Sequence, residues 1–132
     1  MGKNGNIGCA VIGYGGMGGW HCDKIRKDIE GAELIGIYDI KPERCEAAEK
    51  KGIHAFASRE KLLADERIQL VTVATPNDVH KEIVIAALEA GKNVICEKPC
   101  ALSSGDLEQM IAAAQKSGTL LTAHQNRRWD ED

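Results

Sequence analysis

The sequence predicts an α/β fold: a doubly wound parallel sheet between two layers of helices, arranged as a single three-layer α/β/α domain. Short apolar runs alternate along the chain with segments of helical periodicity. The runs are apolar throughout instead of alternating with polar residues, as strands buried on both faces require. A length of 132 residues leaves room for one such domain with one core.

Six runs are expected to form strands, the third of them weakly: residues 7–12, 32–38, 53–57, 69–74, 93–96 and 119–123. Two amphipathic helices are predicted where apolar residues recur at helical spacing, one at Val79, Ile83 and Ala87, and one from Leu107 to Ala114. Gly91 and Gly118 are expected to end these helices. Ser103 and Asp106 form a capping box at the start of the second helix.

Composition excludes two classes of partner. The chain carries 17 basic and 20 acidic residues, a formal net charge of -3, so it lacks the basic excess typical of nucleic-acid-binding proteins. Its apolar runs are far shorter than the ~20 residues that span a bilayer, which predicts no membrane segment. The polar start and the five cysteines without a paired pattern favour a cytoplasmic location, with the cysteines as small buried hydrophobes.

A glycine-rich turn follows the first predicted strand. Gly13, Gly15 and Gly18 form G-x-G-x-x-G at the mouth of the first helix. In a dinucleotide site the first glycine makes a tight turn, the second lets a pyrophosphate approach the backbone, and the third lets helix and strand pack closely. The intervening positions belong to the same predicted site: Tyr14, Gly16 and Met17.

Asp39 ends the second predicted strand, 21 residues beyond Gly18. A carboxylate there accepts hydrogen bonds from both hydroxyls of an adenosine ribose, with Ile40 beside it in the site. NAD is therefore the expected cofactor. NADP is less favoured, because Asp39 repels a 2′-phosphate and no arginine follows at once, although Lys41 softens the discrimination. The structural alternative is that Asp39 merely caps the helix after Pro42.

Two polar clusters follow the fourth and fifth strands. Thr75, Pro76 and Asn77, with His80, form the first cluster, and Glu97, Lys98 and Pro99 form the second. Carboxyl ends of parallel strands share one crevice with the glycine turn. Pro99 restricts Lys98, so its ammonium is available to polarise a substrate oxygen. The alternatives are helix capping by Thr75 and Asn77, a surface role for His80, and a surface ion pair between Lys98 and Glu97.

These motifs together resemble the amino-terminal domain of the glucose-fructose oxidoreductase, inositol dehydrogenase and rhizopine catabolism (Gfo/Idh/MocA) family. The resemblance spans nearly the whole chain, and the Glu-Lys-Pro triplet is its most specific part. The matching segments are the glycine turn with His21, residues 74–77 with His80, residues 97–99, and residues 124–130.

Membership implies a Rossmann-type NAD(P)-dependent oxidoreductase that moves hydride between nicotinamide and a hydroxyl-bearing carbon of a sugar, cyclitol or similar polyol. It implies that the glycines bind pyrophosphate and that Asp39 binds the adenosine ribose. It also implies that Lys98 is catalytic and bridges cofactor and substrate. The remaining cofactor contacts that it implies are Thr75, Pro76 and Asn77 at the centre of the cofactor and Glu97 at the nicotinamide ribose.

The family's substrate domain, with its Asp-x-x-x-His acid/base pair, has no counterpart in these residues, because none of the four histidines follows an aspartate at that spacing. Residues 1–123 are expected to form the NAD(P)-binding domain and residues 124–132 the start of the connection to a substrate domain. The chain alone is then expected to bind cofactor with little or no turnover. Alternatives are a stand-alone nucleotide-binding or regulatory module for NAD or coenzyme A, an S-adenosylmethionine-dependent methyltransferase, and a purely structural protein.

Overall fold

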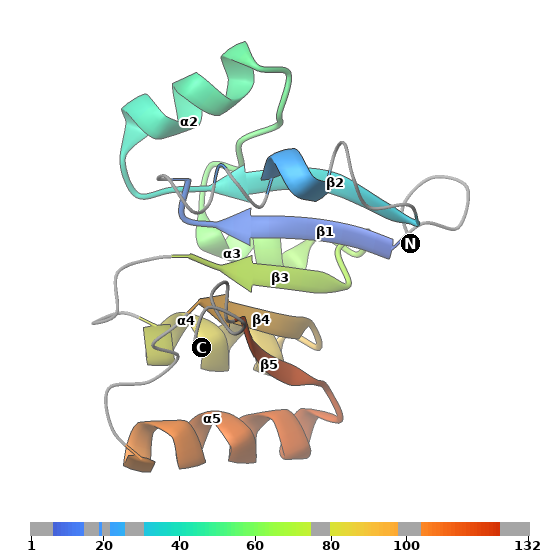
Figure 1. Ribbon diagram of the computed structural model, residues 1–132, viewed down its shortest axis with the longest axis vertical. Coiled ribbons are helices and arrows are strands. Elements are labelled where there is room, and N and C mark those ends of the chain that lie inside the picture. The colour runs from blue at the N-terminus through green and yellow to red at the C-terminus, as the bar shows by residue number, and fades with distance from the viewer. Residues whose placement is uncertain are drawn as a thin grey trace, which may run out of the picture.

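A computed structural model describes residues 7–14, 19, 22–25, 31–74, 80–97 and 104–124. Within these ranges the chain forms a five-stranded sheet in the order β2-β1-β3-β4-β5 (Figure 1). Every neighbouring pair is parallel, which confirms the predicted doubly wound sheet. The strands are β1 (Ile7–Ile12), β2 (Ala32–Tyr38), β3 (Leu70–Val73), β4 (Asn93–Glu97) and β5 (Leu121–His124).

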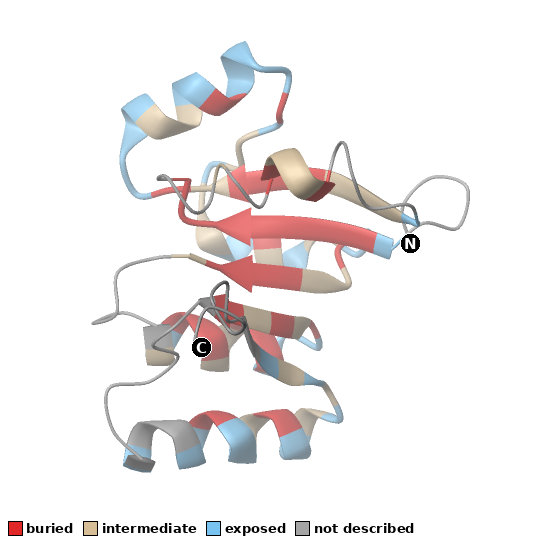
Figure 2. Cartoon of the chain, viewed as in Figure 1, coloured by how far each residue is buried: buried red, intermediate tan, exposed pale blue. Residues whose placement is uncertain are grey.

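Helices cover both faces of the sheet. They are α2 (Pro42–Lys50), α3 (Arg59–Ala64), α4 (His80–Glu89) and α5 (Ser104–Ser117), and residues 22–25 are also helical. The side chains of β1 divide between two core clusters: Ala10 and Ile12 pack with α3, α4 and α5, whereas Cys9 and Val11 pack with residues 22–25 and α2. Among the described strands, β1 and β3 are buried along most of their length, as Figure 2 shows.

The weak strand predicted at residues 53–57 forms only an isolated parallel bridge, between Ala55 and Ile37 of β2. Ile37 N donates to His54 O (2.9 Å), and Phe56 N donates to Ile37 O (2.8 Å). The crossing is close, since a Cβ on Gly36 would lie 2.7 Å from the Phe56 ring and 2.8 Å from His54 O. The segment thus extends the sheet beyond β2 by a single residue.

The helix ends follow the sequence where the structure describes them. Gly91 and Gly118 have positive φ (85° and 68°) after α4 and α5, as their predicted role requires. The Ser103 capping box lies outside the described residues. Helix α3 was not predicted; Ser58 Oγ accepts the Lys61 N–H (3.1 Å) at its start, so the serine before a short helix was the missed signal.

The cysteines differ from one another. Cys9 and Cys22 are buried as expected, and burial raises the pKa of the Cys9 thiol to about 11. Cys45 is half-buried and its Sγ lies 3.3 Å from Asp39 O. Cys96 is buried but disulfide-bonded, so its interpretation as a simple small hydrophobe is wrong. Burial shields a thiol from solvent but does not decide whether a second sulfur is within bonding reach.

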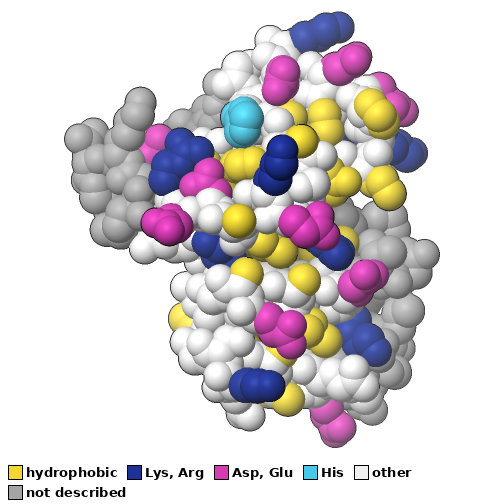
Figure 3. Space-filling model, turned by 180° about the vertical axis from the view of Figure 1, so that it is seen from behind, with side chains coloured by type: hydrophobic (Ala, Val, Ile, Leu, Met, Phe, Trp, Pro, Cys, Tyr) yellow, Lys and Arg dark blue, Asp and Glu magenta, His cyan; other side chains and the backbone are white. Residues whose placement is uncertain are grey.

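Charged side chains of both signs lie on the surface of the described residues. On the face shown in Figure 3, acidic and basic side chains are interspersed, without a broad patch of either sign. None of the described helices has the length and apolar character needed to cross a bilayer.

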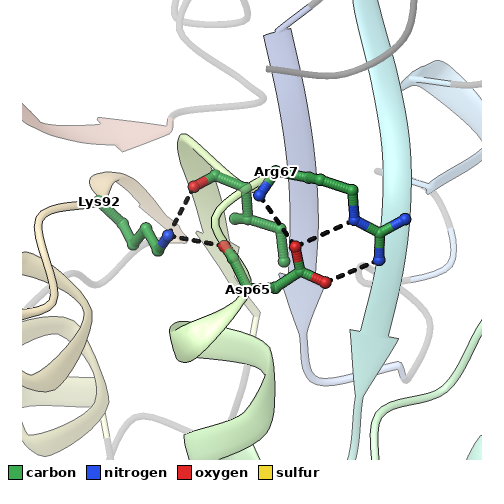
Figure 4. A network of polar contacts seen from close by, with 4 residues as sticks. Asp65, Arg67 and Lys92 are labelled. Atoms are coloured by element: carbon green, nitrogen blue, oxygen red, sulfur yellow. Dashed lines mark hydrogen bonds and ion pairs between the residues drawn. The ribbon is translucent and has the colours of Figure 1, made fainter.

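The edge at which the strands begin, called here the amino edge, is held by Lys92, Asp65 and Arg67 (Figure 4). Lys92 is only 7% exposed, and its Nζ donates to Asp65 O (2.9 Å) and Ile68 O (2.7 Å). This ties the segment before β4 to the segment before β3. Burial lowers the pKa of Lys92, with Asp65 and Glu66 opposing the shift.

Asp65 is in turn held by Arg67. Its Oδ1 accepts from the Arg67 backbone N (2.9 Å) and Nε (3.0 Å), and its Oδ2 accepts from Nη2 (2.7 Å). The side-chain hydrogen bonds from Arg67 are the main reason that the pKa of Asp65 falls to about 2.

Candidate functional site

The carboxyl edge of the sheet, where the strands end, contains the point at which the strand order reverses. β1 lies between β2 and β3, although β3 follows β2 in the chain. Gly13 N donates to Tyr38 O (2.7 Å), and Ala74 N donates to Ile12 O (2.9 Å), so the segments after β1, β2 and β3 meet here. Ligands of open α/β sheets bind at this kind of position.

Gly13 opens the predicted phosphate-binding turn. Its φ of 99° is one that residues with a Cβ rarely adopt, which confirms the tight turn expected of the first glycine. Gly19 and residues 22–25 are helical, so a helix follows the turn as the motif requires. The other predicted residues of the turn lie outside the described residues: Gly15, Gly16, Met17 and Gly18.

Asp39 joins two of the three segments at this edge. Its side chain is 4% exposed. Oδ2 accepts the Tyr14 backbone N–H at 2.7 Å, and Oδ1 accepts the Lys41 backbone N–H at 2.8 Å. A buried carboxylate requires such donors to compensate its lost hydration. The glycine turn and the ribose-binding acid predicted from sequence are therefore directly bonded to each other.

Asp39 does not act as the N-cap of α2. The N-cap residue is Lys41, which makes no side-chain capping bond, and its carbonyl accepts from Arg44 N (3.0 Å) and Cys45 N (3.4 Å). The carboxylate of Asp39 reaches only the Lys41 N–H, ahead of the helix. The capping alternative for Asp39 is thus wrong.

Ile40, which follows Asp39 in sequence, and Tyr14, whose backbone N–H donates to Asp39, differ in exposure. Ile40 is 82% exposed, whereas Tyr14 is 8% exposed and packs in the core cluster with Val11 and Ile37. The buried Tyr14 hydroxyl has no hydrogen-bond partner among the described residues. Ile40 therefore offers an apolar surface beside a buried anion, which suits a ligand with a flat apolar ring next to hydroxyl groups.

Arg44 was missed by the sequence reasoning. Its Nη1 lies 3.4 Å from Asp39 Oδ2. No arginine follows Asp39 directly in the sequence, but the first turn of α2 brings Arg44, five positions on, back to the carboxylate. The signal was Pro42, which favours the first position of a helix and places Arg44 in that first turn.

The remaining predicted residues are only partly covered. Thr75, Pro76, Asn77 and Lys98 lie outside the described residues. His80 is the first residue of α4 and Glu97 the last of β4, and the side chains of both lie outside the described part of the structure. Among the described residues, no group of three or more His, Cys, Asp or Glu side chains is placed to hold a metal ion.

Comparison with known proteins agrees with this geometry. Residues 7–125 match the family Gfo/Idh/MocA, described as "Oxidoreductase family, NAD-binding Rossmann fold". An NAD-binding protein from Listeria innocua superposes with a TM-score of 0.91 at 45% identity, covering 96% of this chain and 37% of that one.

Two curated relatives differ in their named reactions. The chain is 38% identical to a 2,7-anhydro-N-acetylneuraminate hydratase of Mediterraneibacter gnavus, over 89% of this chain and 31% of the relative. It is 36% identical to a myo-inositol 2-dehydrogenase of Thermotoga maritima, over 92% of this chain and 37% of the relative. The chain thus spans about a third of the length of these relatives. It belongs to the Gfo/Idh/MocA oxidoreductase family, of which it forms the NAD-binding Rossmann domain.

Proposed function

We propose that this chain holds NAD(H) across the carboxyl edge of its sheet, as the cofactor-binding part of an enzyme that transfers hydride to or from a hydroxyl-bearing carbon. The observation that carries the proposal is Asp39. It is a buried carboxylate bonded to the glycine turn through Tyr14 N, at the reversal of strand order. A ribose diol and the adjoining pyrophosphate need an acid and a turn in this relation.

Each group of residues has its own part of the cofactor. The turn from Gly13 to Gly18 cradles the pyrophosphate with backbone N–H groups, helped by the positive end of the following helix. Asp39 accepts from the adenosine ribose, and Ile40 packs against the adenine. Toward the reactive end, Thr75, Pro76, Asn77 and His80 hold the centre of the cofactor, and Glu97 holds the nicotinamide ribose.

Lys98 is proposed as the residue closest to the chemistry. Bound NAD supplies a hydride acceptor, and oxidation of an alcohol also requires that the hydroxyl proton leave. An ammonium hydrogen-bonded to that oxygen stabilises the developing negative charge, and it relays the hydroxyl proton by giving one of its own protons to an acceptor as it takes up the proton of the hydroxyl. The main proton acceptor is assigned to sequence outside this chain, so the chain alone binds cofactor with little or no turnover.

The proposed substrate class is a polyhydroxylated ring or chain: a sugar, cyclitol or related polyol. Support comes from the names of the relatives, one of which acts on inositol and the other on an anhydro sugar. Their reactions differ, one a dehydrogenation and the other a hydration. Oxidation by the protein that contains this domain is therefore to be measured directly, as nicotinamide reduction in the presence of candidate polyols.

The cofactor assignment is tested by replacing Asp39 with alanine. The variant is expected to bind NAD at least about tenfold more weakly and to lose less affinity for NADP, because only the diol of NAD donates to the carboxylate. Titration calorimetry on the folded variant measures both. Thermal shifts with NAD, coenzyme A and S-adenosylmethionine serve as the parallel control, since a ligand of the native state raises the melting temperature. Stabilisation by coenzyme A or S-adenosylmethionine and not by NAD would overturn the proposal.

A further inference from the structure

Cys96 is disulfide-bonded although it lies deep in the sheet. Its exposed fraction is 0%, and it belongs to the core cluster that α4 and α5 cover. Within β4 it pairs with Val73 of β3 on one side and with Ala123 of β5 on the other. A paired strand therefore holds its sulfur in place, and the partner sulfur has to come to it.

The sequence leaves one candidate for the partner sulfur within the chain. The structure shows three of the five cysteines to be free: Cys9, Cys22 and Cys45. The remaining one is Cys100, four positions beyond Cys96. A bond between these two encloses the Glu-Lys-Pro triplet, residues 97–99, which supplies Glu97 and Lys98 to the proposed nicotinamide end of the site.

Stabilisation of the fold does not account for a bond at this place. A disulfide stabilises mainly by restricting the unfolded chain, and the effect falls as the loop that it closes becomes shorter. Only three residues separate Cys96 from Cys100. For the cytoplasmic location that the sequence predicts, disulfides are mostly transient and redox-sensing. A regulatory role therefore explains the bond better than a structural role.

The disulfide and an extended triplet exclude each other. Bonded cysteines have Cα atoms about 4.4–6.8 Å apart, whereas four residue steps of extended chain span about 13 Å. Glu97 is the last residue of β4, and Pro99 favours an extended conformation for Lys98. Closing the bond thus requires the chain to turn within the triplet, and opening it lets Lys98 take the conformation that Pro99 favours.

We propose that Cys96 and Cys100 form a reversible disulfide that switches the nicotinamide end of the site. In the dithiol form the triplet is extended and presents Glu97 and Lys98 to the cofactor. In the disulfide form the triplet turns, Lys98 leaves that position, and NAD binds more weakly. The inference rests on the proposed function, because these side chains meet the cofactor only when a nicotinamide dinucleotide lies along the carboxyl edge.

The chemistry is thiol–disulfide exchange, with glutathione disulfide as the oxidant. The thiolate of Cys100 attacks glutathione disulfide, which releases one glutathione thiolate and leaves a mixed disulfide; Cys96 then displaces the second glutathione and closes the bond. The protein thiols lose two electrons and two protons, and one glutathione disulfide becomes two glutathione thiols. A dithiol reverses the reaction. The first attack is assigned to Cys100 because the Cys96 sulfur is buried.

The pairing is tested by mass spectrometry of tryptic peptides after free thiols have been blocked. Trypsin does not cleave between Lys98 and Pro99, so residues 93–116 form one peptide that holds Cys96 and Cys100 and no other cysteine. After equilibration with glutathione disulfide, this peptide is expected to be unblocked and to lack two hydrogen atoms. After dithiothreitol it should be blocked twice. A peptide linked to another cysteine, or still blocked twice after oxidation, would overturn the pairing.

The effect on the cofactor is measured by NMR titration of the oxidised and the reduced chain with NAD⁺. The amides of Tyr14 and Lys41 both donate to Asp39, so their shifts report binding even when it is weak. The reduced chain is expected to bind NAD⁺ at least about fivefold more tightly than the oxidised chain. Equal affinities, or tighter binding by the oxidised chain, would overturn the switch.

Two variants remove the bond from either side. Cys100→Ser and Cys96→Ala should each bind NAD⁺ equally well in both redox buffers; alanine is used at the buried position because serine would place a hydroxyl in the core. Cys45→Ser is the control, since Cys45 is half-buried and free, and it should retain the redox dependence. Circular dichroism confirms that each variant is folded before it is titrated.

Redox dependence that persists in Cys100→Ser, or that disappears in Cys45→Ser, would overturn the assignment to this pair. Failure of the proposed function gives a different result: NAD⁺ then moves neither the Tyr14 nor the Lys41 amide in the reduced chain, while peptide mapping still decides the disulfide.

Discussion

At the amino edge of the sheet the buried charge is the ammonium of Lys92, and at the carboxyl edge it is the carboxylate of Asp39. The ammonium donates to two backbone carbonyls, and the carboxylate accepts from two backbone N–H groups. Each charge links two segments that are distant in sequence. Both edges therefore use a buried ion to join chain segments that lie just beyond the ends of paired strands.

The two edges differ in what surrounds the ion. At the amino edge, hydrogen bonds between protein groups occupy Asp65, Arg67 and Lys92. At the carboxyl edge, Asp39 lies beside the exposed Ile40. It also receives a long contact (3.4 Å) from Arg44, whose side chain is 41% exposed. The amino edge is thus organised for stability, and the carboxyl edge keeps groups available for a ligand. Substitutions at the two edges should separate stability from binding.

Gly8→Ala is expected to have the largest effect on stability. A Cβ at Gly8 would lie 1.8 Å from Arg67 O, so backbone must shift at the amino edge, at a cost of about 3 kcal/mol in the free energy of unfolding. Urea denaturation measures it. Gly52→Ala is the control, because its Cβ meets nothing within 4 Å and only its φ of 83° is strained. An equal loss in both variants would show that the steric argument is wrong.

Lys92→Met should lower the free energy of unfolding by about 2 kcal/mol, because the buried carbonyl of Ile68 loses the ammonium that donates to it, while the half-buried carbonyl of Asp65 retains the Ile68 N–H. NAD affinity of the folded protein should not change. The exposed Lys116→Met provides a comparison in which the loss stays within about 0.5 kcal/mol. A fall in NAD affinity with Lys92→Met would contradict the division between the two edges.

Asp39→Asn inverts this pattern. The amide keeps one acceptor oxygen but turns an NH₂ toward one of the two backbone donors, which should cost about 1.5 kcal/mol of stability. The effect on cofactor binding should be easier to measure than the effect on stability, with NAD affinity reduced about tenfold or more. Denaturation and calorimetry on the same sample give both numbers, and a variant that loses stability but retains full NAD affinity would remove Asp39 from the site.

The smallest effect concerns pH. The pKa of Asp65 is about 2 in the folded protein and about 3.9 in an unfolded chain. The stabilisation is therefore complete above about pH 4 and is lost as the pH falls toward 2. Because the Arg67 side chain is 60% exposed, the stabilisation that its pairing with Asp65 provides should stay below about 1 kcal/mol. The stability difference between the chain and Asp65→Asn, followed by urea midpoints, should shrink over this interval; a constant difference would exclude the mechanism.

The sequence predicted β1 and β2 to the residue because both have apolar side chains on both faces and polar or glycine residues at their ends. The sequence could not show that residues 53–57 form a single bridge and not a strand, because this depends on how closely Phe56 packs against Gly36. Helix α3 was missed because its six residues are too few to show helical periodicity.

For the site, spacing from the glycine turn was enough to predict that Asp39 follows β2, the strand beside the one that ends at the turn. The bond from Tyr14 N to Asp39 and the approach of Arg44 were beyond reach from spacing, because both depend on the path of the chain after β2. Contacts between loops are decided by tertiary packing, and local sequence carries little of that information.

The all-parallel pairing of β1 also constrains the order in which the molecule forms. Cys9 pairs with Leu34 on one side and Leu70 on the other, so the central strand has no partner that a tight hairpin could supply. Until β3 has been synthesised and has crossed over, one side of β1 presents unpaired backbone in an apolar setting. Folding is thus expected to be slow for its size and to be most vulnerable to aggregation while β3 is still missing.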